Sequence, residues 1–139
     1  MDQQRKKLMR IRPVLIILAT IIVFSVFLSP VFIKGQSMEP TYTDGGLTLI
    51  NRLSYLFATP TRGEVVAIKF ADRRLMLLKR IVGLPGETVS MRAGQIFIND
   101  IPLNEPGVIA PWPWHLPSRV LTAEEYFVIG DNRRQPIEE

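Results

Sequence analysis

An uncharged apolar run near the N-terminus most constrains what this chain can fold into. Residues 14–33 read VLIILATIIVFSVFLSPVFI, about 20 residues without a charge, and a helix of that length matches a hydrocarbon core of roughly 30 Å. Pro13 suits the first turn of such a helix, where its missing N–H has no partner to lose. The sequence therefore predicts a transmembrane helix over residues 13–33.

Basic residues gather before this run, which predicts its orientation. Five precede it, whereas Lys34 alone follows directly. The positive-inside rule then puts residues 1–12 in the cytoplasm and residues 34–139 outside. A cleaved secretory signal is disfavoured, because the apolar core exceeds the usual length of about 7–15 residues and no A-x-A pattern follows. The five basic residues are Arg5, Lys6, Lys7, Arg10 and Arg12.

The remaining charges balance. The chain has 17 Lys and Arg and 13 Asp and Glu, and without the five basic residues and Asp2 there remain 12 of each. This balance argues against a nucleic-acid-binding surface. The chain has no cysteine, which excludes disulfides and thiolate nucleophiles. One histidine cannot build a multi-histidine site, so we expect no metal and no cofactor.

Beyond Gly35 the sequence has the texture of strands and turns. Short runs rich in Val, Ile and Phe alternate with Gly, Pro, Asn and Asp, which predicts a mainly β, compact antiparallel domain. Residues 99–100 predict a tight hairpin, and residues 104–119, with four prolines, predict a surface loop. The expected strands cover residues 47–52, 63–70, 75–82, 88–92, 95–98 and 126–129.

A single serine stands in KGQSMEPT, residues 34–41, directly after the apolar run. The hydroxyl of Ser37 is a weak nucleophile unless a base takes its proton. His115 is the one histidine of the chain, so a Ser-His-Asp triad would have to use it. We favour the simpler interpretation, an exposed loop residue packed on Trp114.

Lysine is the other candidate base. In LMLLKRIVGLPGE, residues 75–87, strand alternation puts Lys79 on an apolar face. Burial would lower its pKa and supply a neutral amine, but a lysine that reaches water from a strand edge fits the pattern equally well. Arg80 stays ionised and needs a carboxylate, either Asp131 or Glu87.

Four short sequence blocks, taken in their order along the chain, resemble those of a known protein family. They are GQSMEPT at 35–41, RGEVVAIKF at 62–70, LLKRIVGLPGETV at 77–89 and FVIGDNR at 127–133. With the N-terminal apolar segment, they resemble the type I signal peptidases, which are membrane-anchored serine-lysine endopeptidases. The resemblance implies a signal peptidase β domain at 34–139, with Ser37 as nucleophile and Lys79 as general base.

Further roles follow from the resemblance. The N–H of Ser37 would be the first donor to the oxyanion, and a backbone N–H at Gly35 the second. Pro40 would fix the turn that presents the serine, while Gly83 and Gly86 would permit a bend after the lysine strand.

Similar enzymes bind the substrate as an added β-strand, with small pockets for alanine-sized side chains. The resemblance therefore implies secretory preproteins with small residues at the cleavage site, and the lipid bilayer, as partners. The residues expected to line the pocket are Ile33, Met38, Tyr42, Leu77 and Leu78.

The last block departs from the family. Many relatives have a serine three residues after the arginine of GDNR, whose hydroxyl orients the lysine, whereas this chain has Pro136. A proline side chain donates no hydrogen bond. The chain also stops before the strand that normally closes the family fold, which predicts an open sheet edge.

Two aromatic clusters suggest contact with lipid. APWPWHLP contains Trp112 and Trp114, and SYLFATP contains Tyr55, Leu56 and Phe57. Tryptophan and tyrosine favour the bilayer interface, and covering one edge of a small core is an equally good interpretation.

Two other functions compete with the peptidase. A membrane-tethered β domain that binds extended peptides without cutting them is favoured by Pro136. A self-cleaving Ser-Lys repressor would need a DNA-binding headpiece where this chain has its apolar run. The S-x-x-K pattern of penicillin-binding proteins is absent, because Pro40 stands three residues after Ser37.

Overall fold

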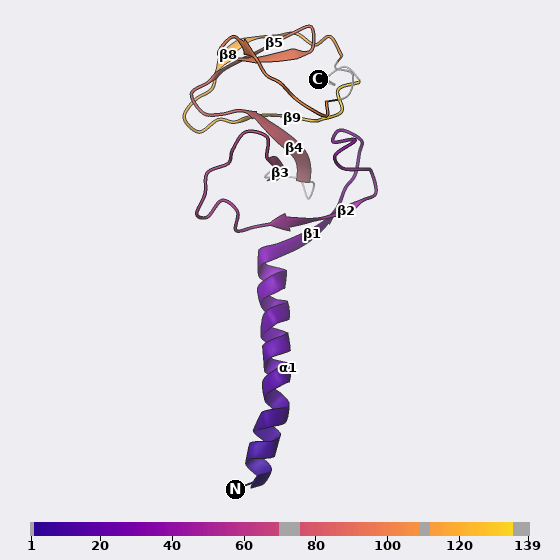
Figure 1. Cartoon of the computed structure of the whole chain (residues 1–139), viewed down its shortest axis with the longest axis vertical. Coiled ribbons are helices and arrows are strands. Elements are labelled where there is room, and N and C mark those ends of the chain that lie inside the picture. Colours follow the sequence, from indigo (N-terminus) through magenta and orange to yellow (C-terminus); the bar gives the residue numbers. More distant parts are fainter. Residues whose placement is uncertain (1, 70–75, 109–111, 135–139) are drawn as a thin grey trace. The chain divides into compact units, whose positions relative to one another are not determined.

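The fold comes from a computed structural model, which describes residues 2–69, 76–108 and 112–134. The chain divides into two compact units. The first comprises Met1–Val31 and Leu47–Ala58, and the second comprises Phe32–Gly46 and Thr59–Glu139. The described residues contain one helix and nine strands, labelled in Figure 1 where there is room.

The first unit consists of a helix and a two-stranded sheet. Helix α1 (Asp2–Phe27) leads directly into β1 (Leu28–Phe32), which pairs with β2 (Leu47–Asn51). The prediction of a helix through residue 33 is wrong for residues 28–32, because Pro30 cannot donate a helical hydrogen bond and disfavours the α conformation at Ser29. Among the described residues, no helix has both the length and the apolar character of a membrane span.

The second unit holds two antiparallel sheets, the first of three strands. Strands β3 (Val65–Lys69), β4 (Met76–Gly83) and β9 (Phe127–Ile129) lie in the order β3-β4-β9. In this register Lys79 is opposite Val66, and Arg80 is opposite Ile129. The central position of β4 pairs it on both sides, so the segment with the predicted base lies on a well-supported strand. Residues 70 and 75, predicted as strand ends, lie outside the described residues.

The second sheet has four strands in the order β7-β6-β5-β8. They are β5 (Thr88–Arg92), β6 (Gln95–Ile98), β7 (Ile101–Pro102) and β8 (Leu116–Val120). Asn99 and Asp100 have φ angles of 50° and 63°, the left-handed conformation that a tight two-residue hairpin requires. The predicted hairpin and the predicted mainly β, antiparallel fold are therefore confirmed.

Strand β8 was not predicted, since its residues belong to the proline-rich segment expected to be a loop. It pairs with β5 through Val89–Arg119 and Met91–Leu116, with a register shift between the two pairs. Pro117 falls within that shift. A proline is tolerated there because β8 is the outer strand of its sheet, where one side needs no hydrogen bonds.

The main hydrophobic core of the second unit collects one apolar face from each sheet. Alternation along β5 and β6 directs their apolar side chains inward, and β4 and β9 contribute from the other sheet. Leu103, Trp114, Leu116 and Phe127 pack against its edge. Its buried residues are Val82, Val89, Met91, Ile96, Ile98, Leu121 and Ile129.

Gly83 ends β4, which carries Lys79, and Gly86 lies in the turn after it. Each position has a different physical reason to be glycine. Gly86 has a φ of +80° and open space where a side chain would begin, so it permits the turn as predicted. Gly83 has no positive φ, and a Cβ there would lie 2.7 Å from Val89 Cγ2 and 2.9 Å from Phe127 Cβ. Close packing therefore requires glycine at position 83, and its role in a bend stays a prediction, with a register shift of β4 between Ile81 and Gly83.

Substitution of these glycines distinguishes the two reasons. We expect Gly83→Asn to lower the free energy of unfolding by about 2–4 kcal/mol, because the side chain forces the core apart. Gly86→Asn should cost less than about 1 kcal/mol, because asparagine tolerates the left-handed conformation. Urea unfolding of both variants measures the difference, and equal losses would contradict the packing argument.

Candidate active site

Ser37 lies in a turn that a buried neighbour anchors. The Glu39 N–H donates to the Gln36 carbonyl at 3.1 Å, and the Tyr42 N–H donates to the Met38 carbonyl at 2.9 Å. Met38 is only 2% exposed, whereas Ser37 is exposed. The turn is thus fixed from below while its serine faces solvent.

Lys79 on β4 reaches this serine. Its Nζ lies 2.9 Å from Ser37 Oγ, which is hydrogen-bond distance. The lysine is 42 residues away in sequence, and the fold brings the two side chains together. The two residues that the resemblance assigns as nucleophile and base are therefore in direct contact.

The environment of Lys79 favours its neutral form. Burial lowers the pKa of its ammonium group from the ordinary value of 10.5, and the charge of Asp131 opposes that shift. Loss of water around a cation always disfavours the charged state. The strand pattern left open whether this lysine reaches solvent, and the structure makes the residue partly buried. Its amine is therefore easier to deprotonate than a surface lysine.

Asp131 is the partner of Arg80. Arg80 Nε donates to Asp131 Oδ1 at 2.8 Å and Nη2 to Oδ2 at 2.6 Å, a bidentate pair, and the Thr41 hydroxyl donates to Oδ2. Burial raises the pKa of Asp131, but hydrogen bonds from Arg80 and Thr41 outweigh burial and hold that pKa below 3.8. Of the two carboxylates considered for Arg80, Glu87 pairs with Arg62 instead.

Gly130 and Asn132, on either side of this aspartate, touch the serine turn. The Asn132 N–H donates to the Ser37 carbonyl at 3.1 Å, and Asn132 Nδ2 donates to the Gln36 carbonyl at 3.0 Å. A Cβ on Gly130 would lie 2.3 Å from the Ser37 carbonyl oxygen and 3.4 Å from Lys79 Nζ. Sequence reasoning singled out neither residue, although both letters stand in the FVIGDNR block.

The proposed second oxyanion donor is already engaged. The Gly35 N–H donates to Asp44 Oδ1 at 2.8 Å, so the prediction that it faces the oxyanion is wrong for this conformation. Asp44 competes for the donor because a carboxylate is a stronger acceptor than a neutral carbonyl. Pro40, predicted to fix the serine turn, follows a cis peptide bond.

The five residues predicted to line a substrate pocket do not all share one strand face, and they differ in burial. Because successive strand side chains point to opposite faces, Leu77 shares the face of Lys79 and Leu78 lies on the other. All five have reduced exposure, with Ile33 and Met38 buried and Tyr42, Leu77 and Leu78 partly buried.

The aromatic residues divide between the two interpretations left open by the sequence. Trp114 is partly buried and packs against the core, as the core-covering interpretation requires. Trp112 is 46% exposed and Phe57 is 94% exposed, which leaves both available for other contacts. His115 is exposed, in keeping with a loop residue.

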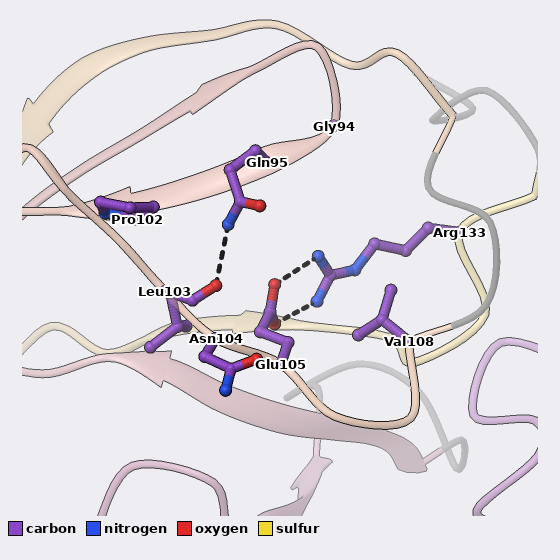
Figure 2. A pocket seen from close by; sticks show the side chains of 8 residues that line it. All are labelled: Gly94, Gln95, Pro102, Leu103, Asn104, Glu105, Val108 and Arg133. Atoms are coloured by element: carbon purple, nitrogen blue, oxygen red, sulfur yellow. Dashed lines mark hydrogen bonds and ion pairs between the residues drawn. The ribbon is translucent and has the colours of Figure 1, made fainter.

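A separate cavity of about 450 Å³ lies in the second unit, without any predicted site residue in its lining (Figure 2). The buried Arg133 is one of its lining residues and makes a bidentate pair with Glu105. This pair explains why the last residue of GDNR is an arginine, since it ties the block to the segment after β7. The cavity is lined by Gly94, Gln95, Pro102, Leu103, Asn104, Glu105, Val108 and Arg133.

Pro136, where relatives have a serine, lies outside the described residues. Within the part of the chain that the structure describes, no three His, Cys, Asp or Glu side chains gather as a metal site.

A serine hydroxyl held against a partly buried lysine on a β scaffold is the arrangement of serine-lysine hydrolases. Comparison with known proteins agrees with this class. Residues 5–136 match the family model described as signal peptidase, peptidase S26, and the chain belongs to that family.

Several relatives are similar over most of this chain. It is 33% identical to a signal peptidase I of Leptolyngbya laminosa over 73% of this chain and 54% of that protein. It is 33% identical to signal peptidase I V of Bacillus subtilis over 73% of this chain and 68% of that protein. It is 28% identical to signal peptidase I U of the same species over 94% and 76%. The chain thus spans only about half the length of the first of these relatives.

The Arg80–Asp131 pair predicts an acid-sensitive contribution to stability. Asp131→Asn leaves a partly buried guanidinium without its counter-charge, so we expect the free energy of unfolding at pH 7 to fall by about 1–4 kcal/mol. Because the pKa of Asp131 is lowered on folding, its ionisation stabilises above the ordinary value of 3.8 and the effect is lost as pH falls through the folded pKa. Unfolding curves of the wild type and of Asp131→Asn, recorded at pH 7 and in acid, measure this loss of unfolding free energy.

Asp100→Asn is the matched control. Asp100 pairs with Arg92 with its side chain 77% exposed, so its loss should cost less than about 0.5 kcal/mol at any pH. Equal losses in both variants would contradict the importance of the Arg80 pair.

Proposed function

We propose that this chain is a membrane-bound serine endopeptidase that removes N-terminal signal peptides from secreted preproteins. The observation that carries the proposal is the 2.9 Å contact between Ser37 Oγ and Lys79 Nζ, with the lysine partly removed from water. Family membership and the similarity to signal peptidases I support the substrate class.

The mechanism follows from this contact. Neutral Lys79 accepts the hydroxyl proton while Ser37 Oγ attacks the scissile carbonyl carbon, and the Ser37 N–H donates to the developing oxyanion. The ammonium of Lys79 then protonates the leaving amine as the peptide bond breaks, leaving an acyl-serine ester. Water, deprotonated by Lys79, hydrolyses the ester and restores the hydroxyl.

The substrate binds in extended form along the sheet. Among the described strands, β3 and β9 are the outer strands of the sheet that carries Lys79, and a free strand edge suits main-chain hydrogen bonding to a peptide. Small side chains at the cleavage site fit beside buried Met38 and Ile33, because larger ones would clash.

The N-terminal segment attaches the enzyme to the membrane. Residues 11–26 of α1 are exposed on every side, although apolar residues dominate them, and such a surface favours lipid over water. The basic residues before it favour a cytoplasmic N-terminus and an extracytoplasmic catalytic domain.

Loss of either dyad residue should abolish processing. In membranes that contain a preprotein with an A-x-A site, we expect Ser37→Ala, Lys79→Ala and Lys79→Arg each to reduce cleavage by at least about 10³-fold, the scale of losing a nucleophile or its base. Lys79→Arg fails because arginine stays protonated.

Ser118→Ala is the matched control, because Ser118 is an exposed position on a strand of the other sheet. This variant should process at the wild-type rate. Processing by the dyad variants at the control rate would eliminate the enzyme and leave a tethered peptide-binding domain.

The pH dependence tests the base. Since the folded pKa of Lys79 is lowered, we expect kcat/KM to rise with pH through a midpoint below 10.5, the ordinary lysine value. The unfolding free energy should also rise with pH between the folded pKa and 10.5, because the unfolded chain binds more protons there. Lys79→Met should remove this slope, and an activity midpoint at 10.5 or above would sink the mechanism.

A further inference from the structure

The carbonyl of Gln36 is held by two donors. It accepts from the Glu39 N–H at 3.1 Å and from Asn132 Nδ2 at 3.0 Å. The next carbonyl, that of Ser37, accepts from the Asn132 N–H at 3.1 Å. Asn132 therefore holds the serine turn at two consecutive carbonyls, one with its backbone and one with its side chain.

A held carbonyl also fixes the N–H of the same peptide unit. The bond between Gln36 and Ser37 is not among the cis bonds of the chain, and in a planar trans peptide the N–H points opposite to the C=O. With the Gln36 carbonyl turned toward Asn132, the Ser37 N–H points away from it. Within the described residues, this N–H donates to no acceptor, so it is available to a ligand.

The loop that carries Asn132 is itself fixed. Asp131 is tied to Arg80 and Thr41, and Arg80 is the strand neighbour of Lys79. Gly130 approaches the Ser37 carbonyl so closely that a Cβ would lie 2.3 Å from its oxygen. The strand that supplies the base thereby sets where Asn132 meets the serine turn.

We propose that Asn132 is a positioning residue that orients the Ser37 N–H toward the oxyanion of the tetrahedral intermediate. The inference rests on the proposed function and deepens it. It matters here because the Gly35 N–H is held by Asp44, which leaves the Ser37 N–H to carry the backbone stabilisation of the negative charge. If the peptide between Gln36 and Ser37 rotated freely, the Gln36 carbonyl instead of the Ser37 N–H could face the oxyanion.

The isosteric variant Asn132→Asp tests the side-chain donor. It keeps the oxygen that accepts from the Arg134 N–H at 3.4 Å but cannot donate to the Gln36 carbonyl. Asn132→Ala is the second variant, which removes the donor without adding charge. Asn99→Asp is the matched control, because Asn99 Oδ1 accepts from the Thr88 N–H and a carboxylate preserves that bond.

Three measurements separate positioning from folding. With a peptide substrate, we expect kcat to fall about 10- to 100-fold in both Asn132 variants, while KM changes less than about threefold. Affinity for an alanine-ended peptide aldehyde, whose carbonyl carbon bonds to Ser37 Oγ to give an oxyanion-like adduct, should fall as much as kcat. In Asn132→Ala the midpoint of the pH dependence of kcat/KM should stay at the wild-type value, because the burial of Lys79 is unchanged.

Failure of the proposed role of Asn132 and failure of the proposed function give different results. Wild-type kcat and aldehyde affinity in both variants, with Ser37→Ala inactive, would overturn the role of Asn132 and leave the dyad intact. Cleavage by Ser37→Ala at the wild-type rate would instead overturn the proposed function. If a variant is partly unfolded by circular dichroism at the assay temperature, kcat is divided by the folded fraction, and a corrected value equal to wild type also counts against the inference.

Discussion

The contact between one amine and one hydroxyl organises the second unit of this protein. Lys79 can serve as a proton acceptor only if it is kept from water, and it can serve Ser37 only within hydrogen-bond distance. Partial burial of Lys79 meets the first condition, and the turn anchored by buried Met38 meets the second. Asp131 works against the neutral amine, and its bidentate pair with Arg80 places a positive charge beside that carboxylate.

The segment from Gly130 to Arg133 joins these parts through four successive residues with four different tasks. Gly130 allows close approach to the serine turn, Asp131 pairs with Arg80, and Asn132 holds two carbonyls of the turn. Arg133 is buried and paired with Glu105. A short block of residues can thus reflect several unrelated physical requirements that fall on neighbouring positions.

Composition predicted much of the fold, and its failures have physical reasons. Short runs rich in apolar residues, bounded by turn residues, located β5 and β6 to the residue. Pro30 suggested an end to the helix, but an apolar run of this length favours a helix throughout, so strand β1 was not predicted. Strand β8 was hidden by Pro117, which only an edge position tolerates. For the site, the lysine pattern suggested a base but could not decide its burial, and Asn132 acts on backbone carbonyls, which no side-chain pattern encodes.

The distance along the chain between the parts of the site has a consequence for biosynthesis. Gln36 and Asn132, which meet in the folded protein, are 96 residues apart, so the serine emerges from the ribosome long before the loop that supports it. The serine turn therefore gains its support from Asn132 only when nearly all of the described chain has been synthesised.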